Sequence, residues 1–295
     1  MNIGLSNNIK KRLIIFRFFL YIIKKLTNKN KYNFAIYSND YIGKNLIFKN
    51  YYEEEYLFLF KKFLDINKIR VNTFIDIGAN IGNHSVFFSD ICKNIHSFEP
   101  SSKAFELLRI NTRFKNIKIH KLGLSDVNGR ALLRESMFNL GGSNIIKSTK
   151  KKNFFTENIK INRLDNLRLL KLEKIDLIKI DTEGHELKVL KGSIKIIKKN
   201  LPIILLEQNI SDIENGKSKS LLFLERYGYT FYELDAELYS AQTNILNKLL
   251  KIVRHLCISK KAKFKMIFAT KLINKDYRLI MAINKNNKKY NSIHD

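Results

Sequence analysis

Short, nearly continuous apolar runs alternate with amphipathic stretches through the middle of the chain. The apolar runs, which are typical of buried strands, span residues 71–77, 94–98, 116–122, 175–180, 201–206, 229–234 and 277–283. Helical spacing of apolar residues follows at 85–91, 101–114, 186–199 and 218–227, and residues 123–135 indicate a turn and hairpin. Strands buried on both faces, with helices between them, predict a doubly wound, mostly parallel α/β sheet. A ligand of such a sheet binds at the carboxyl ends of the strands.

The two ends of the chain differ from this middle part. Ten of the twelve glycines and both prolines lie between Gly78 and Gly228, so turns and close backbone approaches concentrate there. We expect a basic, partly helical N-terminal extension at residues 1–60 and a main domain at 61–284. A basic insertion at 236–277, with apolar residues at helical spacing, and a polar tail at 285–295 complete the expected organisation.

The net charge of +27 is concentrated in the flanks. Residues 1–50 hold ten Lys and Arg against one Asp, and residues 236–295 hold thirteen against three acids. Two explanations stay open: codon usage in an AT-rich genome, or contact of the flanks with an anionic surface. The apolar run at 13–23, interrupted by Arg17, is too short for a membrane span. Either an interfacial amphipathic helix or a helix packed on the main domain fits it.

Two cysteines cannot form a disulfide framework, which favours a reducing, cytoplasmic location. With the basic flanks, we also expect peripheral contact with an anionic inner membrane.

The sharpest motif runs from Phe74 to Ser85, where a strand passes through Asp76-x-Gly78-x-x-x-Gly82 into a helix. Glycines there let the backbone approach a ligand, and the N–H groups at the helix start favour an anion. The spacing is neither a dinucleotide fingerprint nor a P-loop, and it suits a small anionic group such as an amino-acid carboxylate. An ordinary tight strand–helix turn is the alternative.

Acidic residues follow the neighbouring strands. Glu99 ends the next strand, where a carboxylate can accept both hydroxyls of a ribose, and Asp126 is positioned to accept from an adenine amino group. The turn-forming sequence at 126–129 offers a purely structural reading of Asp126. Asp181, Glu183 and His185 crowd the end of the fourth strand, and Glu207 ends the strand after it. A structural alternative is that Glu183 and Glu186 only favour the N-terminus of the following helix.

These pieces resemble, in order, the FkbM family of S-adenosylmethionine-dependent methyltransferases. The matching segments are FIDIGANIGNHS, SFEPSSKAFELL, LGLSDVNG, FNLGGSNI, INRLDNL, DLIKIDTEGHELKVLKG and PIILLEQ, which together cover residues 74–207. The resemblance implies a class I methyltransferase (Rossmann-like) fold with a seven-stranded sheet whose last strand is antiparallel. It also implies methyl transfer to a hydroxyl oxygen of a sugar, glycolipid or other small-molecule acceptor, which points to surface glycan biosynthesis.

Carried over by position, the resemblance assigns roles to three groups of residues. The cofactor-binding group comprises Asp76, Gly78, Ala79, Asn80, Gly82, Asn83, Glu99, Ser125, Asp126 and Asp181. The catalytic group comprises Asp181, Glu183 and His185, and the acceptor group comprises Gly142, Ser143, Asn144 and Glu207. His185 departs from the family pattern, in which this position is often a small residue.

The identity of the base that takes the hydroxyl proton stays open between a neutral His185 and a desolvated Asp181 or Glu183. We expect no metal, although Asp181 and Glu207 holding a divalent ion is an alternative.

Two rival functions remain. A nucleic-acid methyltransferase fits the basic flanks but lacks the Asn/Asp-Pro-Pro-Tyr motif after the fourth strand and a Pro-Cys nucleophile. A non-catalytic membrane-surface protein would not need the intact glycine motif and Glu99.

Overall fold

A computed structural model describes residues 33–37, 40–46, 49–114, 116–135, 143–146, 155–168, 174–235, 263–273 and 275–287. The predicted apolar helix at 13–23, the helical part of the basic insertion, most of the polar tail and Gly142 lie outside these residues. Membrane contact through the basic flanks therefore stays a prediction. Within the described part of the chain, no helix has the length and apolar character needed to cross a bilayer.

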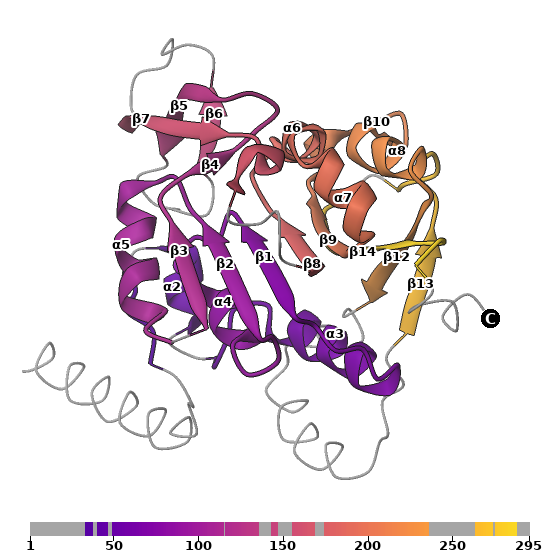
Figure 1. Ribbon diagram of the computed structural model, residues 1–295, viewed down its shortest axis with the longest axis horizontal. Coiled ribbons are helices and arrows are strands. Elements are labelled where there is room, and N and C mark those ends of the chain that lie inside the picture. The colour runs from indigo at the N-terminus through magenta and orange to yellow at the C-terminus, as the bar shows by residue number, and fades with distance from the viewer. Residues whose placement is uncertain are drawn as a thin grey trace, which may run out of the picture.

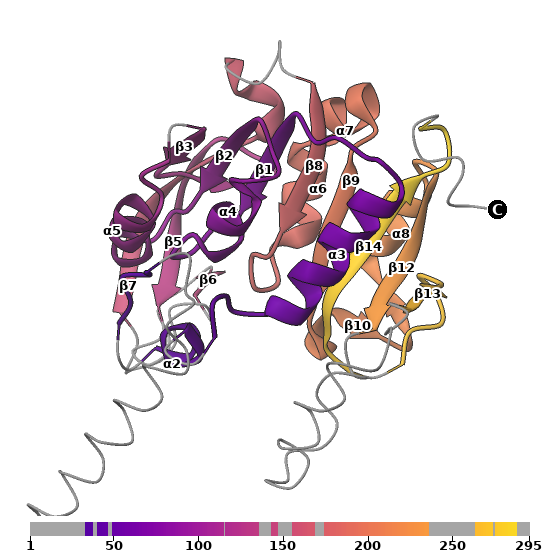
Figure 2. The same ribbon diagram turned by 90° about the horizontal axis from the view of Figure 1, so that it is seen from below.

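An eight-stranded sheet forms the centre of the molecule (Figures 1 and 2). Its spatial order is β13-β12-β14-β9-β8-β1-β2-β3. The bounds are β1 Thr73–Ile77, β2 Asn94–Phe98, β3 Ile117–His120, β8 Ile175–Ile180, β9 Ile203–Gln208, β12 Tyr229–Asp235, β13 Lys263–Ile267 and β14 Tyr277–Asn284. The five strands from β3 to β9 are parallel, and β14 runs antiparallel to both of its neighbours. The predicted α/β class and the antiparallel last strand are confirmed.

Helices cover both faces of this sheet because its central strands are buried on both sides. One face packs against α6 (Glu186–Gly192), α7 (Ile194–Asn200) and α8 (Lys219–Glu225), through residues such as Ile75, Ile178 and Leu190. The other face packs against α3 (Glu54–Ile66) and α4 (Asn83–Phe88), around Phe60, Phe74 and Phe88. Alternate side chains of β1 thus enter opposite cores, as the geometry of a strand dictates.

The register of the central strands brings three chain segments to one place. Ile77 at the end of β1 pairs with Ile180 of β8, and Ile180 pairs with Leu206 of β9. The residues that come next along each strand are the glycine loop, Asp181 and Glu207. These segments therefore meet at the carboxyl edge, as expected for a parallel sheet.

A second, four-stranded sheet was not predicted. It contains β4 (Gly123–Leu124), β7 (Phe155–Asn162), β5 (Gly129–Glu135) and β6 (Asn144–Ile146), in that order, where only a hairpin at 123–135 was expected. Carboxylates attach it to α5 (Ser102–Asn111): Ser101 Oγ donates to Glu135, and the backbone N–H of Ser102 donates to Glu157. Figure 1 shows this small sheet at the end of the large sheet, beside β2 and β3.

Three further expectations are corrected. The boundary expected after residue 60 falls inside α3. Residues 263–267 of the basic insertion form strand β13, which adds an eighth strand to the expected seven. The single helix expected at 186–199 is two helices, because Ser193 leaves helical geometry and its hydroxyl bonds back to the Val189 carbonyl at 2.7 Å. The short helix α2 (Tyr41–Leu46) lies in the predicted N-terminal extension.

The end of α6 supplies a test of this packing. A Cβ atom added at Gly192 would lie 1.9 Å from the carbonyl oxygen of Ser125. We expect Gly192→Ala to lower the free energy of unfolding by about 1–3 kcal/mol, because overpacking against backbone outweighs the gain in helix propensity. Urea denaturation measures the change. The control, exposed Lys191→Ala, should stay within about 0.5 kcal/mol of wild type, and equal stability of the two variants would contradict the packing.

Candidate active site

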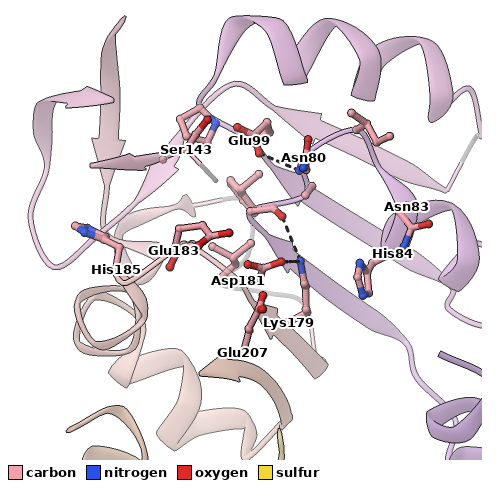
Figure 3. Close-up of a pocket in the computed structure, with 18 of the residues that line it drawn as sticks. Asn80, Asn83, His84, Glu99, Ser143, Lys179, Asp181, Glu183, His185 and Glu207 are labelled. Carbon is pink, nitrogen blue, oxygen red and sulfur yellow. Dashed lines mark hydrogen bonds and ion pairs between the residues drawn. The ribbon is translucent and has the colours of Figure 1, made fainter. Parts of the chain in front are cut away.

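A cavity of about 310 Å³ opens at the carboxyl edge of the large sheet (Figure 3). This volume is at the lower end of the range for small-molecule sites. The lining comes from the loop after β1, the ends of β2, β8 and β9, the small sheet, β14 and the segment before α3. Of the predicted residues, the cavity is lined by Gly78, Ala79, Asn80, Asn83, Glu99, Ser143, Asp181, Glu183, His185 and Glu207.

The glycine loop is shaped by contacts within the protein. The backbone N–H groups of Gly78 and Ala79 both donate to the Phe98 carbonyl at 3.0 Å. Gly78 has φ +74°, and a Cβ there would lie 1.8 Å from the carbonyl oxygen of Asp181. A Cβ at Gly82 would lie 2.9 Å from side-chain carbons of Leu108 and of Thr112. The glycines were expected to admit a ligand. The close approaches they permit are instead to β8 and α5.

Glu99 holds this loop with both of its carboxylate oxygens. Oε2 accepts the Asn80 N–H and Oε1 accepts the Ser101 N–H, each at 2.9 Å. Burial raises the pKa of Glu99 to about 7, although these two hydrogen bonds oppose the shift. The side-chain oxygen of Asn80 is buried and has no hydrogen-bond partner among the residues that the structure describes. Because Asn80 also lines the cavity, this oxygen is available to a polar group of a ligand.

Two residues predicted to bind the cofactor have hydrogen-bond partners within the protein. Asp76 is fully buried beneath the loop, accepts from Ser85 Oγ at 2.5 Å and does not line the cavity. Asn83 lines the cavity, but its amide is engaged with the backbone of Tyr52: Oδ1 accepts the Tyr52 N–H at 2.9 Å, and Nδ2 donates to the Tyr52 carbonyl at 3.0 Å.

Lys179, which is not among the predicted residues, lies at the centre of the site. Its ammonium nitrogen is 2.9 Å from Asp181 Oδ2, 3.3 Å from the Gly78 carbonyl and 3.8 Å from Asp76 Oδ1 (Figure 3). Burial lowers the pKa of Lys179, but the charges of Asp181 and Asp76 outweigh burial and raise it. Lys179 stays charged, and it lowers the pKa of Asp181 against the effect of burial. A lysine in a strand whose other residues, apart from Asp176, are Ile and Leu is the signal in the sequence.

Glu207 points toward Asp181 and has the opposite protonation state. Burial, and then the charge of Asp181, raise the pKa of Glu207 to about 10, so at neutral pH the pair holds one proton, on Glu207. Arg278 Nη1 lies 3.2 Å from Glu207 Oε1. Lys179 and Arg278 therefore already supply the positive charge that a divalent ion would bring. Among the described residues, no three His, Cys, Asp or Glu side chains are grouped as metal ligands.

The predicted bases Glu183 and His185 have different surroundings. Glu183 is half-buried at φ +51°, and burial, followed by the Asp181 charge, raises its pKa to about 7. Figure 3 shows the ring of His185 directed away from Asp181, and its Nε2 lies 2.9 Å from Ser125 Oγ. Burial lowers the pKa of His185 to about 4. His185 is thus engaged outside the centre of the site, which argues against its predicted role as the base.

Ser125 and Asp126 were expected to bind the cofactor, Asp126 at the adenine, but neither lines the cavity. Ser125 Oγ lies between His185 and Asp126, 3.1 Å from Asp126 Oδ1. The cavity wall at that position consists of the apolar residues Leu122 and Leu124 with Gly123. Of the predicted acceptor residues on the small sheet, Ser143 lines the cavity and Asn144 begins β6.

Four further residues that line the cavity were not predicted as site residues. Tyr52 and Glu53 precede α3, His84 lies in the first turn of α4, and Arg278 comes from β14. Glu53 Oε2 is 3.9 Å from His84 Nε2. Burial, followed by the charge of Asp181, raises the pKa of Glu53 to about 7, and burial lowers the pKa of His84 to about 3. No local motif marks Glu53 or Arg278, because only the fold brings them to the cavity.

Comparisons with known proteins place this site in context. The family model of the Methyltransferase FkbM domain matches residues 76–231. The hexuronic acid methyltransferase AglP of Haloferax volcanii is 30% identical over 119 residues, which are 40% of this chain and 48% of AglP. The chain thus spans about half the length of this relative.

Solved methyltransferase structures are more distant. Methyltransferase FkbM from Methylobacillus flagellatus KT is 20% identical, with a TM-score of 0.34, over 46% of this chain and 32% of its own. Precorrin-6y C5,15-methyltransferase from Geobacter metallireducens GS-15 is 15% identical, with a TM-score of 0.39, over 87% of this chain and 96% of its own.

Replacing Lys179 tests the charge arrangement. Lys179→Met leaves the buried Asp76 and the half-buried Asp181 without their cation, so we expect a loss of about 3–5 kcal/mol in the free energy of unfolding at pH 8. Without the cation, both carboxylates take up protons on folding, so the variant's stability falls as the pH rises and the loss is smaller at pH 5.5. Urea titrations at both pH values measure it, with exposed Lys188→Met as the control. An equal loss at both pH values would refute the arrangement.

Proposed function

The chain belongs to the FkbM methyltransferase family, and on this basis we propose that it transfers the methyl group of S-adenosylmethionine to a hydroxyl oxygen of a sugar. The observation that carries the proposal is the arrangement of the cavity. The loop held by Glu99 forms one wall, and the network of Asp181, Lys179 and Glu207 forms the facing wall. Both walls follow the carboxyl ends of adjacent parallel strands, where ligands of such sheets bind.

The residues present fit S-adenosylmethionine. The unpartnered Asn80 oxygen and the Glu99 carboxylate line the side of the cavity formed by the loop, and Leu122 and Leu124 supply an apolar wall for a base. We assign Asn80, Glu99, the loop around Gly78 and this apolar wall to the binding site of the cofactor. When bound, the cofactor supplies an electrophilic methyl group, so the protein's task is to align the acceptor and take up its proton.

The remaining side chains suit a hydroxyl-bearing acceptor. Glu207, protonated at neutral pH, donates to the ionised Asp181, and the carboxyl oxygens of this pair can accept hydrogen bonds from acceptor hydroxyls. Tyr41, Tyr52 and Arg278 add aromatic and cationic surface on the acceptor side. The similarity to AglP, which is a hexuronic acid methyltransferase, supports a sugar as the acceptor class. A glycolipid or surface glycan is the form in which we expect this sugar to occur.

Loss of the loop contact should weaken cofactor binding. Glu99→Gln presents an amide group to one of the two backbone N–H donors, so one hydrogen bond is lost and replaced by donor–donor repulsion. We expect the dissociation constant of S-adenosylmethionine to rise about tenfold, measured by isothermal titration calorimetry. The exposed Glu106→Gln variant is the control, and an unchanged affinity in Glu99→Gln would remove Glu99 from the cofactor site.

The acceptor class is tested directly with labelled cofactor. The purified full chain is incubated with methyl-labelled S-adenosylmethionine and a hexuronide, a neutral hexoside or an amino-sugar glycoside, with or without a lipid tail. We expect label in at least one glycoside, in a product stable to base as an ether is and an ester is not. Tight binding of S-adenosylmethionine with no label in any glycoside would contradict the sugar acceptor. The absence of binding would contradict the methyltransferase proposal.

A further inference from the structure

We propose that Glu53 is the catalytic residue that takes the acceptor's proton, and that His84 holds the acceptor hydroxyl beside it. This inference rests on the proposed function and deepens it, because it identifies a proton acceptor outside the segment matched by the family model. Both side chains line the cavity, and both are largely buried, with exposed fractions of 14% for Glu53 and 8% for His84.

The backbone directs Glu53 into the cavity. Glu53 occupies the N-cap position of α3 with φ 57° and ψ 32°, a left-handed conformation that is strained for a residue with a side chain. The Glu53 side chain makes no capping hydrogen bond to the backbone N–H groups of α3. Strain of this kind is retained where the surrounding structure enforces it, and it concentrates at functional sites.

The two residues are held together by the neighbours of each. Tyr52, which precedes Glu53, exchanges two hydrogen bonds through its backbone with the side chain of Asn83, which precedes His84. An amide side chain paired with a backbone N–H and C=O in this way fixes both the distance and the orientation of the two segments. The loop before α3 is therefore docked on the first turn of α4, and the Glu53–His84 geometry is preorganised.

The separation of the two groups leaves room for a hydroxyl. Their nearest atoms, Glu53 Oε2 and His84 Nε2, are 3.9 Å apart, too far for a hydrogen bond between them. A hydroxyl oxygen lying about 2.8 Å from both atoms fits this gap. The acceptor hydroxyl then donates its proton to Glu53, and an Nε2–H of neutral His84 donates to the hydroxyl oxygen.

The charges around Glu53 suit this role. It faces titratable groups from four strands and helices and from its own loop: His84 of α4, Lys179 of β8 with Asp181 beyond its end, Glu207 of β9, Arg278 of β14 and Tyr52. Burial and the Asp181 charge outweigh Lys179, Arg278 and a hydrogen bond from Tyr52, which brings the pKa of Glu53 to about 7. A base with a pKa near the working pH is the most effective proton acceptor.

The other candidate bases are already engaged. Asp181 is paired with Lys179, Glu207 carries the shared proton, and Ser125 occupies Nε2 of His185. Glu183 has a similarly raised pKa, but Asn209 Nδ2 approaches its carboxylate at 3.4 Å. Glu183 is therefore the competing proton acceptor that an experiment must separate from Glu53.

The step balances as a single displacement. The acceptor O–H bond breaks and its proton passes to Glu53. The oxygen electron pair forms the new bond to the methyl carbon, and the pair of the broken carbon–sulfur bond stays on sulfur. The ionised Glu53 carboxylate becomes a neutral carboxylic acid in this step. It returns its proton to solvent after product release.

The test compares Glu53→Gln with Glu183→Gln, and with Glu55→Gln as the matched control, since Glu55 lies in the same helix and pairs with Lys49 at the surface. S-adenosylmethionine affinity is measured by calorimetry, and the transfer rate is measured from pH 5.5 to 8.5 with the glycoside that wild type labels best. In wild type, kcat/KM should rise with pH and level off above about pH 7, because Glu53 must be ionised to accept a proton.

We expect Glu53→Gln to lower kcat about 100-fold and to abolish the rise of kcat/KM with pH. Its dissociation constant for S-adenosylmethionine should stay within threefold of the wild-type value. Glu183→Gln should keep the rise with pH, and Glu55→Gln should match wild type. A rise that disappears in Glu183→Gln and persists in Glu53→Gln would overturn the inference and leave the proposed function intact. Failure of wild type to label any glycoside would overturn both.

If Glu53→Gln does not fold or does not bind the cofactor, Glu53→Asp tests the same role. The shorter carboxylate retains the base but withdraws it from the hydroxyl. We expect kcat to fall about tenfold with the rise with pH preserved. A Glu53→Asp enzyme of wild-type rate and an unchanged pH profile would overturn the assignment.

Discussion

The buried ammonium group of Lys179 is the interaction on which the site depends. It binds the carbonyl of Gly78 in the loop after β1 and the carboxylate of Asp181 after β8, and it lies close to Asp76 beneath them. Because Lys179 keeps Asp181 ionised, the proton of the Asp181–Glu207 pair resides on Glu207. One cation thus fixes the position of the loop and also determines which of the two acids donates and which accepts.

Most of the large sheet was predictable because burial on both faces leaves a local trace in the sequence. The strands at 94–98 and 175–180 were predicted with their observed bounds, and the neighbouring helix at 101–114 begins where Ser101 caps it. The small sheet was missed because its strand at 155–162 is mostly exposed and short of continuous apolar residues. The break at Ser193 was missed because apolar residues keep helical spacing on both sides of it, at Leu187, Leu190, Ile194 and Ile197.

The site was predicted where residues directly follow parallel strands. Glu99, Asp181, Glu183 and Glu207 meet at one cavity because strand register alone brings them together. Asp126 lies outside the cavity lining and the His185 ring is directed away from Asp181, because loop geometry, not strand order, decides where these side chains point. Their assigned roles stay predictions. Lys179 was overlooked since one lysine among 54 Lys and Arg residues attracts no attention until its burial is known. Glu53 and Arg278 come from distant parts of the chain that carry no motif.

The two hydrogen bonds between Asn83 and the backbone of Tyr52 have a consequence for how this protein is divided into parts. They join a stretch of chain outside the residues that the family model matches to a helix inside them. Because Tyr52, Glu53 and Arg278 line the cavity but lie outside residues 76–231, the matched segment does not contain the whole lining. A fragment cut at the two ends of the matched segment would therefore have an incomplete cavity.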